Sequence, residues 1–499
     1  MRDGREAGEG LALRDLAAGH TAGADGYIRF PVDAGTWSRL CDGCAGGQQD
    51  LQALWADGGT MCLALGDPGH VLRAIVSLAT DAGRYPSVAS RHRPALRLER
   101  AMRDLYGVEP VGLPDPRPWL DHGRWPGRQG DAPYPFLPVE GEGLHQIPVG
   151  PVHAGIIEPG HFRFTANGET VVRLEERLGY VHKGVEGLMA GASIENGARL
   201  AGRISGDSTV AYAWAFARAV EAALGWTPPA RAVLLRAVMA ELERVAHHIG
   251  DVGAICNDAS VVAIHASCAV QREDVLAVAG ACFGHRLMMD CIVPGGVAVD
   301  LEPDGVGRIR GLLARLEATR SDVLRVYDSM PSLQDRTVTT GIVSPALVRQ
   351  YAAGGFVGRA SGRAFDARKS FAYAPYDQVD FALKVRSGGD VDARLLVRLD
   401  EIGESLAILA QLLDRLAPGA IRGDRPAVSS GEGAGLIEAF RGDVFVDVRV
   451  LDGRLARVHA RDASWFQWPL LEAAIEGNIV ADFPLCNKSF NCSYSGHDL

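Results

Sequence analysis

A cluster of prolines divides this chain and limits how it can fold. Eleven of its 26 prolines lie between Pro110 and Pro159. Proline fixes φ and has no amide hydrogen to donate, so this stretch is expected to be extended and irregular. We therefore predict one domain over residues 1–125, a Pro/Gly-rich linker over 126–148 and a second domain over 149–499.

The bulk composition is that of an ordinary globular protein. Hydrophobic residues make up 47% of the 499 residues and charged residues 22%. The formal net charge is −10, so no nucleic-acid partner is expected. The most apolar segment, 252–270, contains Asp258 and His265 and is too polar for a membrane-spanning helix, and the N-terminal segment does not resemble a signal peptide. Any membrane association is expected to come through partners.

The cysteines favour reduced thiols over disulfides or a metal site. There are nine, an odd number spread thinly along the chain. Only Cys41 and Cys44 form a CxxC pair, and one pair cannot complete a four-ligand metal site. We interpret them as incidental cysteines in a Gly-rich turn, with a metal or redox role as the alternative.

The hydrophobic patterning predicts an α+β fold with a small α/β domain and a large, mainly helical domain. In the first domain, residues 60–65 and 70–79 are predicted strands and 93–108 a predicted helix. In the second, the predicted strands are 161–166 and 169–179, the predicted helices are 230–249, 307–329 and 390–416, and a hairpin joins 444–451 to 454–460 through Asp452–Gly453.

The predicted helix over 230–249 has one apolar face. That face is formed by Leu235, Val238, Met239, Leu242, Val245 and Ile249. The spacing places Arg236, Glu243 and His247 away from it.

Three stretches resemble a known family. Residues 92–126 resemble the small hydrophilic subunit of complex I (NADH:quinone oxidoreductase). Residues 150–164 and 177–189 resemble the start of the large subunit of formate hydrogenlyase and other group 4 nickel–iron hydrogenases. Residues 358–381 and 389–406 resemble a region shared by complex I and hydrogenase large subunits. The chain is therefore identified as a fusion of the two hydrophilic subunits.

The resemblance assigns four positions to the ligands of a nickel–iron site. Such a site takes two pairs of cysteine thiolates, because soft metal centres bind thiolates far better than alcohols. The first pair falls at Ser205 and Ser208, and the second at Cys492 and Ser495. Most ligands are lost, so no nickel–iron site is expected. Alternatively, these are polar residues that fill the former site, and the serines suit helix N-caps.

The resemblance also implies groups for proton transfer. Glu158 matches the glutamate that passes protons beside the metal in hydrogenases, and His153 and His161 lie in the same segment. A partly buried carboxylate has a raised pKa and can relay protons. The alternative is that all three are hydrogen-bonded structural residues. The quinone-binding positions of complex I fall at Ile157 and Gly206, so that chemistry is in doubt; Asp207 and Tyr212 lie nearby but match neither pattern.

The shared region contains further charged residues. The resemblance implies that Arg359, Asp366 and Arg368 lie near the active cavity and the interface with the small subunit; the favoured interpretation is a buried ion-pair network that holds domains together. Arg244, His247 and His248 either line the same interface or form a solvated helix end.

The resemblance implies the large subunit of a membrane-associated oxidoreductase complex. Its expected partners are a small subunit with an iron–sulfur cluster, antiporter-like membrane subunits and a dehydrogenase module. No cofactor is expected in this chain, which is expected on the cytoplasmic side of the membrane. One hypothesis is a nickel-free subunit that couples electron or proton events to the membrane arm. The alternatives are a non-catalytic scaffold, a genuine nickel–iron hydrogenase component and an NADH–quinone oxidoreductase component.

Overall fold

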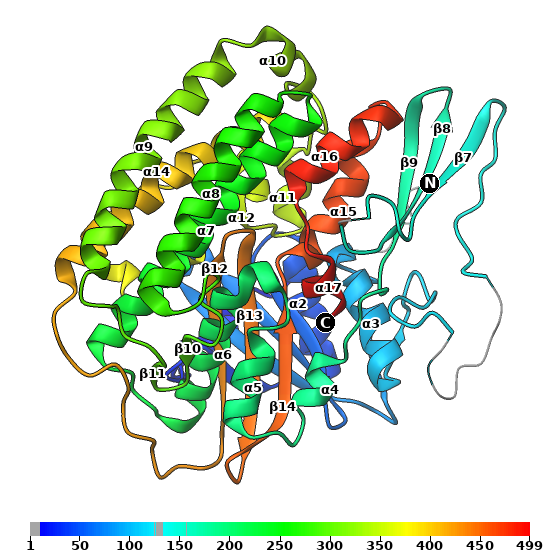
Figure 1. Cartoon of the computed structure of the whole chain (residues 1–499). Helices are drawn as coiled ribbons and strands as arrows, with labels where there is room; N and C mark the ends of the chain where they lie inside the picture. Colours follow the sequence, from blue (N-terminus) through cyan, green and yellow to red (C-terminus); the bar gives the residue numbers. More distant parts are fainter. Residues whose placement is uncertain (1–9, 124, 126–132, 156) are drawn as a thin grey trace.

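The computed structural model describes residues 10–123, 125, 133–155 and 157–499. A four-stranded N-terminal sheet, drawn in blue in Figure 1, lies behind a three-stranded sheet from near the C-terminus, drawn in orange. Long helices lie on one side of these sheets, and a third sheet, β7–β9, projects on the other. This architecture, a small N-terminal unit beside a larger helical one, confirms the predicted α+β class.

The N-terminal sheet has the strand order β1-β4-β3-β2. β1 pairs in parallel with β4, and β2, β3 and β4 form antiparallel pairs. The bounds are β1 (Ile28–Pro31), β2 (Asp50–Asp57), β3 (Thr60–Asp67), β4 (Leu72–Ala79), α2 (Ala34–Ala45) and α3 (Leu96–Tyr106). The predicted strands are confirmed as β3 and β4 and the predicted helix as α3, whereas the sequence pattern did not indicate β2.

The proline-rich stretch contains little regular structure where it is described. Its strands are the short β6 (Glu109–Val111) and β7 (Leu144–Val149). Residues 133–138 of the predicted linker are neither helix nor strand, and residues 126–132 lie outside the described residues. The amide of Leu137 donates to the carboxylate of Glu175 at 2.9 Å, so the extended segment is anchored on β9.

Two antiparallel sheets belong to the large unit. The first contains β7, β8 (His161–Asn167) and β9 (Thr170–Arg177), and the second β12 (Gly431–Ala439), β13 (Gly442–Leu451) and β14 (Arg454–Arg461). The predicted hairpin is confirmed as β13–β14. Asp452 and Gly453 in its turn have φ angles of 49° and 75°, a backbone region that glycine adopts without strain.

Alternate glycines on β12 allow close contact with helix α6 (Thr209–Leu224). A Cβ atom on Gly431, Gly433 or Gly435 would lie only 2.0–2.3 Å from a carbonyl oxygen of α6. Those oxygens belong to Ala223, Ala219 and Ala215, one helical turn apart. Small residues on both elements therefore bring the helix backbone onto the sheet and fix the start of α6, where the first pair of candidate ligands lies.

The long helices form a bundle beside these sheets. Its main members are α7 (Ala230–Asp258), α8 (Val262–Phe283), α9 (Gly305–Asp328) and α14 (Val391–Arg415). Of these, α7, α9 and α14 confirm the three predicted helices. Arg236, Glu243 and His247, which lie away from the apolar face, are buried as well. α7 packs against α8 and α14 and also contacts the start of α6, so no side of its central part is free.

The remaining helices are short and connect these layers. They are α1 (Leu13–Ala17), α4 (Val185–Met189), α5 (Ile194–Ala201), α10 (Pro331–Thr337), α11 (Pro345–Gln350), α12 (Gly355–Ala360), α13 (Ala367–Ser370), α15 (Ser464–Ile475), α16 (Phe483–Phe490) and α17 (Tyr494–Asp498). Two further strand pairs are β5 (Arg84–Pro86) with β6, and β10 (Ile292–Val293) with β11 (Gly296–Val297).

The N-terminal sheet packs directly on the C-terminal one. The ring of Trp55 on β2 stacks on His459 of β14 with centroids 5.1 Å apart, and the guanidinium of Arg461 donates to the carbonyl of Gln52 at 2.6 Å. Aromatic stacking and buried charge-assisted hydrogen bonds therefore join the two units.

Candidate functional site

The first pair of candidate ligands lies in the loop before α6. Ser205 precedes a short 3-10 turn, η3 (Gly206–Ser208). Its hydroxyl donates to the carboxylate of Asp207 at 2.7 Å and lies 3.0 Å from the hydroxyl of Ser493, two residues from Ser495. The two segments that carry the candidate ligands therefore meet in space.

The serines do not cap α6. Ser208 occupies the N-cap position, but within the described chain its side chain accepts no amide hydrogen of the helix. The carboxylate of Glu243, on α7, accepts from the amides of Val210 and Ala211 at 2.8 and 3.2 Å instead. Burial raises the pKa of Glu243 to about 8, even though these amides lower it. The interpretation of the serines as N-caps is therefore wrong.

The second pair lies between α16 and the C-terminus. Cys492 is buried, and burial raises the pKa of its thiol well above the usual range, which keeps it protonated. Ser495 lies in α17, and its backbone amide donates to the carboxylate of Glu158 at 3.0 Å.

Arg441 connects the two segments. Its guanidinium pairs with the carboxylate of Asp207 at 2.5 and 2.8 Å, and its Nε donates to the carbonyl of Asn491 at 2.5 Å. The same guanidinium lies 3.4 Å from the hydroxyl of Ser208. Burial alone would raise the pKa of Asp207, but Arg441 outweighs this effect and holds that pKa below its usual range. The permanently charged guanidinium of Arg441 therefore lies beside both segments that carry the candidate ligands.

This set of donors does not fit a nickel–iron centre. Three of the four positions are hydroxyls, which are hard, weak ligands, and the fourth is a protonated thiol. The guanidinium of Arg441 adds positive charge where a metal would need anionic ligands. Among the residues that the structure describes, no group of three or more His, Cys, Asp or Glu side chains is arranged to hold a metal ion.

Glu158 lies at the surface, so the expectation that its carboxylate is partly buried is wrong. Its carboxylate accepts from the amide of Ser495 and lies near the ammonium of Lys183, which donates to the carbonyls of Ile204 and Ser495 at 3.1 and 3.3 Å. Burial lowers the pKa of Lys183, and the negative charge of Glu158 acts in the opposite direction. Glu158 therefore stands at the outer side of the candidate ligand segments, within reach of bulk water.

The two histidines of this segment have different surroundings. His161 is buried on β8, and its Nδ1 lies 3.3 Å from the carbonyl of Gly150; burial lowers the pKa of this imidazole. His153 packs between the rings of Phe162 and Tyr494, and neither of its nitrogens has a hydrogen-bond partner among the described residues. The structure thus places His153, but not His161, next to the segment of Cys492 and Ser495.

The structure also shows where the positions that match the quinone-binding residues of complex I lie. Ile157 is half-buried beside Glu158, and Gly206 lies in η3. Tyr212, on α6, is buried and its hydroxyl donates to the carboxylate of Asp462 at 2.6 Å. Both polar groups near this position, Asp207 and Tyr212, are therefore engaged inside the protein.

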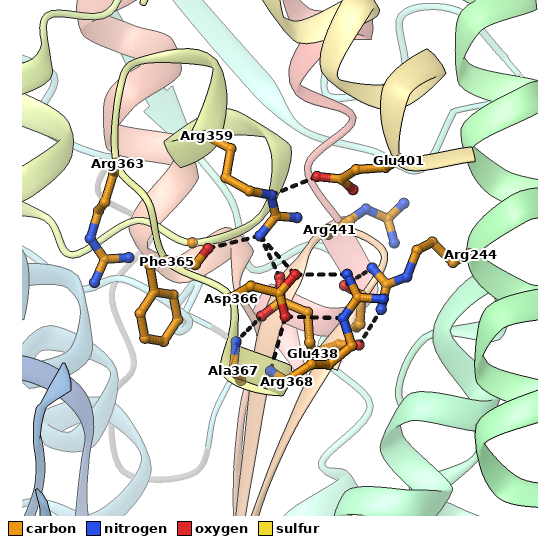
Figure 2. Close-up of polar contacts among 12 residues, drawn as sticks. Arg244, Arg359, Arg363, Phe365, Asp366, Ala367, Arg368, Glu401, Glu438 and Arg441 are labelled. Carbon is orange, nitrogen blue, oxygen red and sulfur yellow. Dashed lines mark hydrogen bonds and ion pairs between the residues drawn. The ribbon is translucent and has the colours of Figure 1, made fainter. Parts of the chain in front are cut away.

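A buried network of charges lies deeper in the large unit (Figure 2). The guanidinium of Arg359 contacts the carboxylates of Glu401 at 2.5 Å, Glu438 at 2.9 Å and Asp366 at 3.4 Å. Arg368 pairs with Asp366 at 2.7 Å. These side chains are almost fully buried, which agrees with the expected buried ion-pair network.

The network ties elements of the large unit to one another. It joins the α12–α13 segment to α7, α14 and β12, since Arg368 contacts Glu241 of α7 at 2.9 Å and Arg359 contacts Glu401 of α14 and Glu438 of β12. One contact between the two units lies beside it, where Arg363 pairs with Asp50 at 2.6 Å. The expectation that Arg359, Asp366 and Arg368 themselves hold domains together is therefore corrected.

Arg244, His247 and His248 are buried in the middle of α7 and are not a solvated helix end. The His247 ring stacks on Phe440 with centroids 4.6 Å apart, and the Nε2 of His248 lies 2.9 Å from the carboxylate of Glu401. Burial lowers the pKa of His247 to about 4, so this imidazole is neutral at neutral pH.

Sequence reasoning missed Arg441, Glu438 and Glu401. Glu438 lies near the end of β12, which is mostly apolar, and Arg441 lies in the turn that follows; a buried charged side chain in such a place must find a partner or shift its pKa. That pattern, ionisable residues in or next to a mostly apolar strand, was a usable signal.

Cys41 and Cys44 lie in helix α2, so the expectation of a Gly-rich turn is wrong. Both are buried, and burial raises the pKa of each thiol. Buried, protonated thiols on one helix agree with the interpretation of incidental cysteines.

Comparison with known families defines the class of protein. Residues 52–135 match the family model of the 30 Kd subunit of the respiratory-chain NADH dehydrogenase, and residues 258–432 match that of its 49 Kd subunit. One chain thus fuses two hydrophilic subunits of the complex I type.

Comparison with individual proteins narrows the family further. The chain is 31% identical to formate hydrogenlyase subunit 5 of Escherichia coli (strain K12), covering 85% of this chain and 79% of the relative. It is 30% identical to hydrogenase-4 component G of the same organism, covering 86% and 78%. The chain therefore belongs to the formate hydrogenlyase and hydrogenase-4 family of large subunits, related to complex I.

One solved structure is also similar. It is that of the membrane-bound sulfane sulfur reductase, an archaeal respiratory membrane complex, with a TM-score of 0.68 and 26% identity over 73% of this chain and all of that one. In the described part of the present chain, no helix is long and apolar enough to cross a membrane.

Proposed function

We propose that this chain is the peripheral large subunit of a membrane-associated oxidoreductase complex, that it contains no nickel, and that it couples electron or proton events to the membrane arm. The expected partners are an iron–sulfur small subunit, antiporter-like membrane subunits and a dehydrogenase module, with the chain on the cytoplasmic side. Membership of the formate hydrogenlyase family and the likeness to a membrane complex support this assignment.

The observation that carries the nickel-free proposal is the position of Arg441. Its ion pair with Asp207 and its bond to the carbonyl of Asn491 connect the two segments that would supply the metal ligands. A metal would have to displace this cation and bind hydroxyls in place of thiolates, and both changes disfavour it.

Metal analysis of the complex purified with its small subunit tests this proposal. We expect no nickel above background, and iron only at the level of the small subunit's clusters. As a control, a nickel–iron hydrogenase complex purified in parallel should give near-stoichiometric nickel. Stoichiometric nickel bound to this chain would contradict the proposal and make it an unusual hydrogenase.

Replacing Glu158 with glutamine separates the coupling role from a scaffold. Because Glu158 is exposed beside the candidate site and can exchange protons with water, Glu158→Gln is expected to reduce the electron-transfer activity of the assembled complex about 100-fold or more, in the range of a lost general acid–base group. Activity of the purified complex and subunit stoichiometry measure this effect.

The matched control is Glu169→Gln, which removes an exposed carboxylate on the β8–β9 turn. It should leave both assembly and activity unchanged. A Glu158→Gln complex with full assembly and unchanged activity would favour the scaffold alternative, because a scaffold does not need a titratable group at this position.

A further inference from the structure

A second group of ionisable residues lies between α3 of the N-terminal unit and the large unit. Arg97 of α3 donates to Glu176 of β9 at 3.1 Å and to Glu472 of α15 at 2.7 Å. The backbone amide of Glu176 also donates to the Glu472 carboxylate at 2.8 Å. Two carboxylates from different elements thus converge on a single guanidinium.

The charges of this group do not balance if both carboxylates are ionised. Arg97 supplies one positive charge, and its other contact is the ring of Trp119, 4.6 Å away, which carries no counter-charge. The side chain of Glu176 is fully buried, and its Oε1 has no hydrogen-bond partner among the described residues. An unpaired buried carboxylate is costly, whereas a protonated carboxyl is neutral.

The surrounding charges do not supply the missing cation. Arg100, the next cation on α3, is paired with Asp115 at 3.1 Å. Glu175, beside Glu176 on β9, is paired with Arg117 at 2.5 Å. The other ionisable groups that face the pair are the Cys492 thiol and the hydroxyls of Tyr351 and Tyr494, all of which are neutral at neutral pH.

We propose that Glu176 and Glu472 together bind one exchangeable proton, so that one carboxylate pairs with Arg97 and the other is a neutral acid. Two carboxyl groups held close together cannot both ionise at little cost, and they titrate as a pair. Burial is the main cause that raises the pKa of both groups, and the charge of Glu472 raises the pKa of Glu176 further, which agrees with this arrangement.

The site lies next to the segment of Cys492 and Ser495. A negative charge on Glu176 raises the pKa of the Cys492 thiol, so the two groups lie within electrostatic range of each other. A negative charge that develops near Cys492 would therefore strengthen proton binding at the pair. Use of this proton by an oxidoreductase rests on the proposed function, but proton binding itself belongs to the chain alone.

Infrared difference spectra of the full-length chain test proton binding. At neutral pH, the wild-type-minus-Glu176→Gln spectrum should show the carbonyl stretch of one protonated carboxylic acid. Wild type minus Glu175→Gln should lack that band, because Glu175 is paired with Arg117 as an anion. A Glu176→Gln spectrum that loses carboxylate bands and no acid band would overturn the proposal.

The variant Glu472→Gln provides an independent test if Glu176→Gln does not fold. Its side chain is 23% exposed, so the substitution is better tolerated, and it removes the same shared proton. The melting temperature of wild type should fall as the pH rises above about 4.5, because the folded pair keeps a proton that the unfolded chain releases. In both glutamine variants, the melting temperature should fall less steeply with pH than in wild type. Slopes equal to that of wild type would contradict the proposal, whether or not the assembled complex is active.

Discussion

Replacing Arg359 with methionine is expected to lower the free energy of unfolding by about 3–5 kcal/mol, the usual cost of removing one partner from a buried ion pair. Arg359 is almost fully buried and contacts the carboxyl groups of Glu401, Glu438 and Asp366 at once. Methionine keeps much of the volume but no charge, so the three carboxylates lose their shared counter-ion. Urea unfolding of the purified chain measures this change.

The matched control is Arg325→Ala. Arg325 pairs with Asp322 at 2.9 Å on the surface, where both side chains are more than two-thirds exposed. Exposed pairs contribute about 0–1 kcal/mol, so this substitution should change stability little. Equal effects of the two variants would mean that the buried network does not stabilise the fold.

Replacing Glu186 with glutamine is expected to have an effect of similar size. The buried carboxylate of Glu186 accepts from Arg457 and from the imidazole of His459, each at 2.8 Å, from the amide of Ala460 at 3.0 Å, and from the hydroxyl of Tyr106 at 2.8 Å. Tyr106 belongs to α3, so this carboxylate also joins the two units. Removing its charge leaves Arg457 buried without a counter-ion, at a cost of about 3–5 kcal/mol.

The effect of Glu186→Gln should depend on pH. Burial would raise the pKa of Glu186, but Arg457 and His459 outweigh it and lower that pKa below 4.5. A carboxylate with a depressed pKa stabilises the fold above its unfolded-state pKa, and this contribution is lost as the pH falls. The difference between wild type and variant should therefore be full at neutral pH and shrink below about pH 4.5.

Melting temperatures of both proteins across this pH range test the expectation. Glu195→Gln is the control, because Glu195 pairs with Arg425 at the surface and both side chains are about half exposed. It should give a small difference from wild type at every pH. A Glu186→Gln difference that grows as the pH falls would have the wrong sign and would contradict the assigned pKa shift.

Local patterns predicted the regular elements well. The Asp452–Gly453 turn between two alternating strands specified the β13–β14 hairpin, and helical periodicity located α7, α9 and α14. These signals depend on neighbouring residues alone, which is why one sequence suffices. The orientation of Glu243 and His247 did not follow, since burial on all sides of α7 depends on what packs there.

The candidate site was predicted only as a set of positions. The resemblance identified Ser205, Ser208, Cys492 and Ser495, but not that Arg441 reaches both segments from the turn between β12 and β13. Nor did it indicate that Glu158 is exposed. The side chain of Arg441, 234 residues away in the sequence, approaches Asp207 only after the sheet and α6 have packed together.

The sequence by itself determined the α+β class, the fusion of two subunit types and the presence of serine at three of the four positions that the resemblance assigns to cysteine ligands, because each of these depends on local residue patterns. Tertiary structure alone decided which charges meet. The pairing of Arg441 with Asp207, the Arg359 network and the two carboxylates on Arg97 join residues that are distant in sequence. The free energy of a buried charge depends on its neighbours in space, and only the folded chain supplies them.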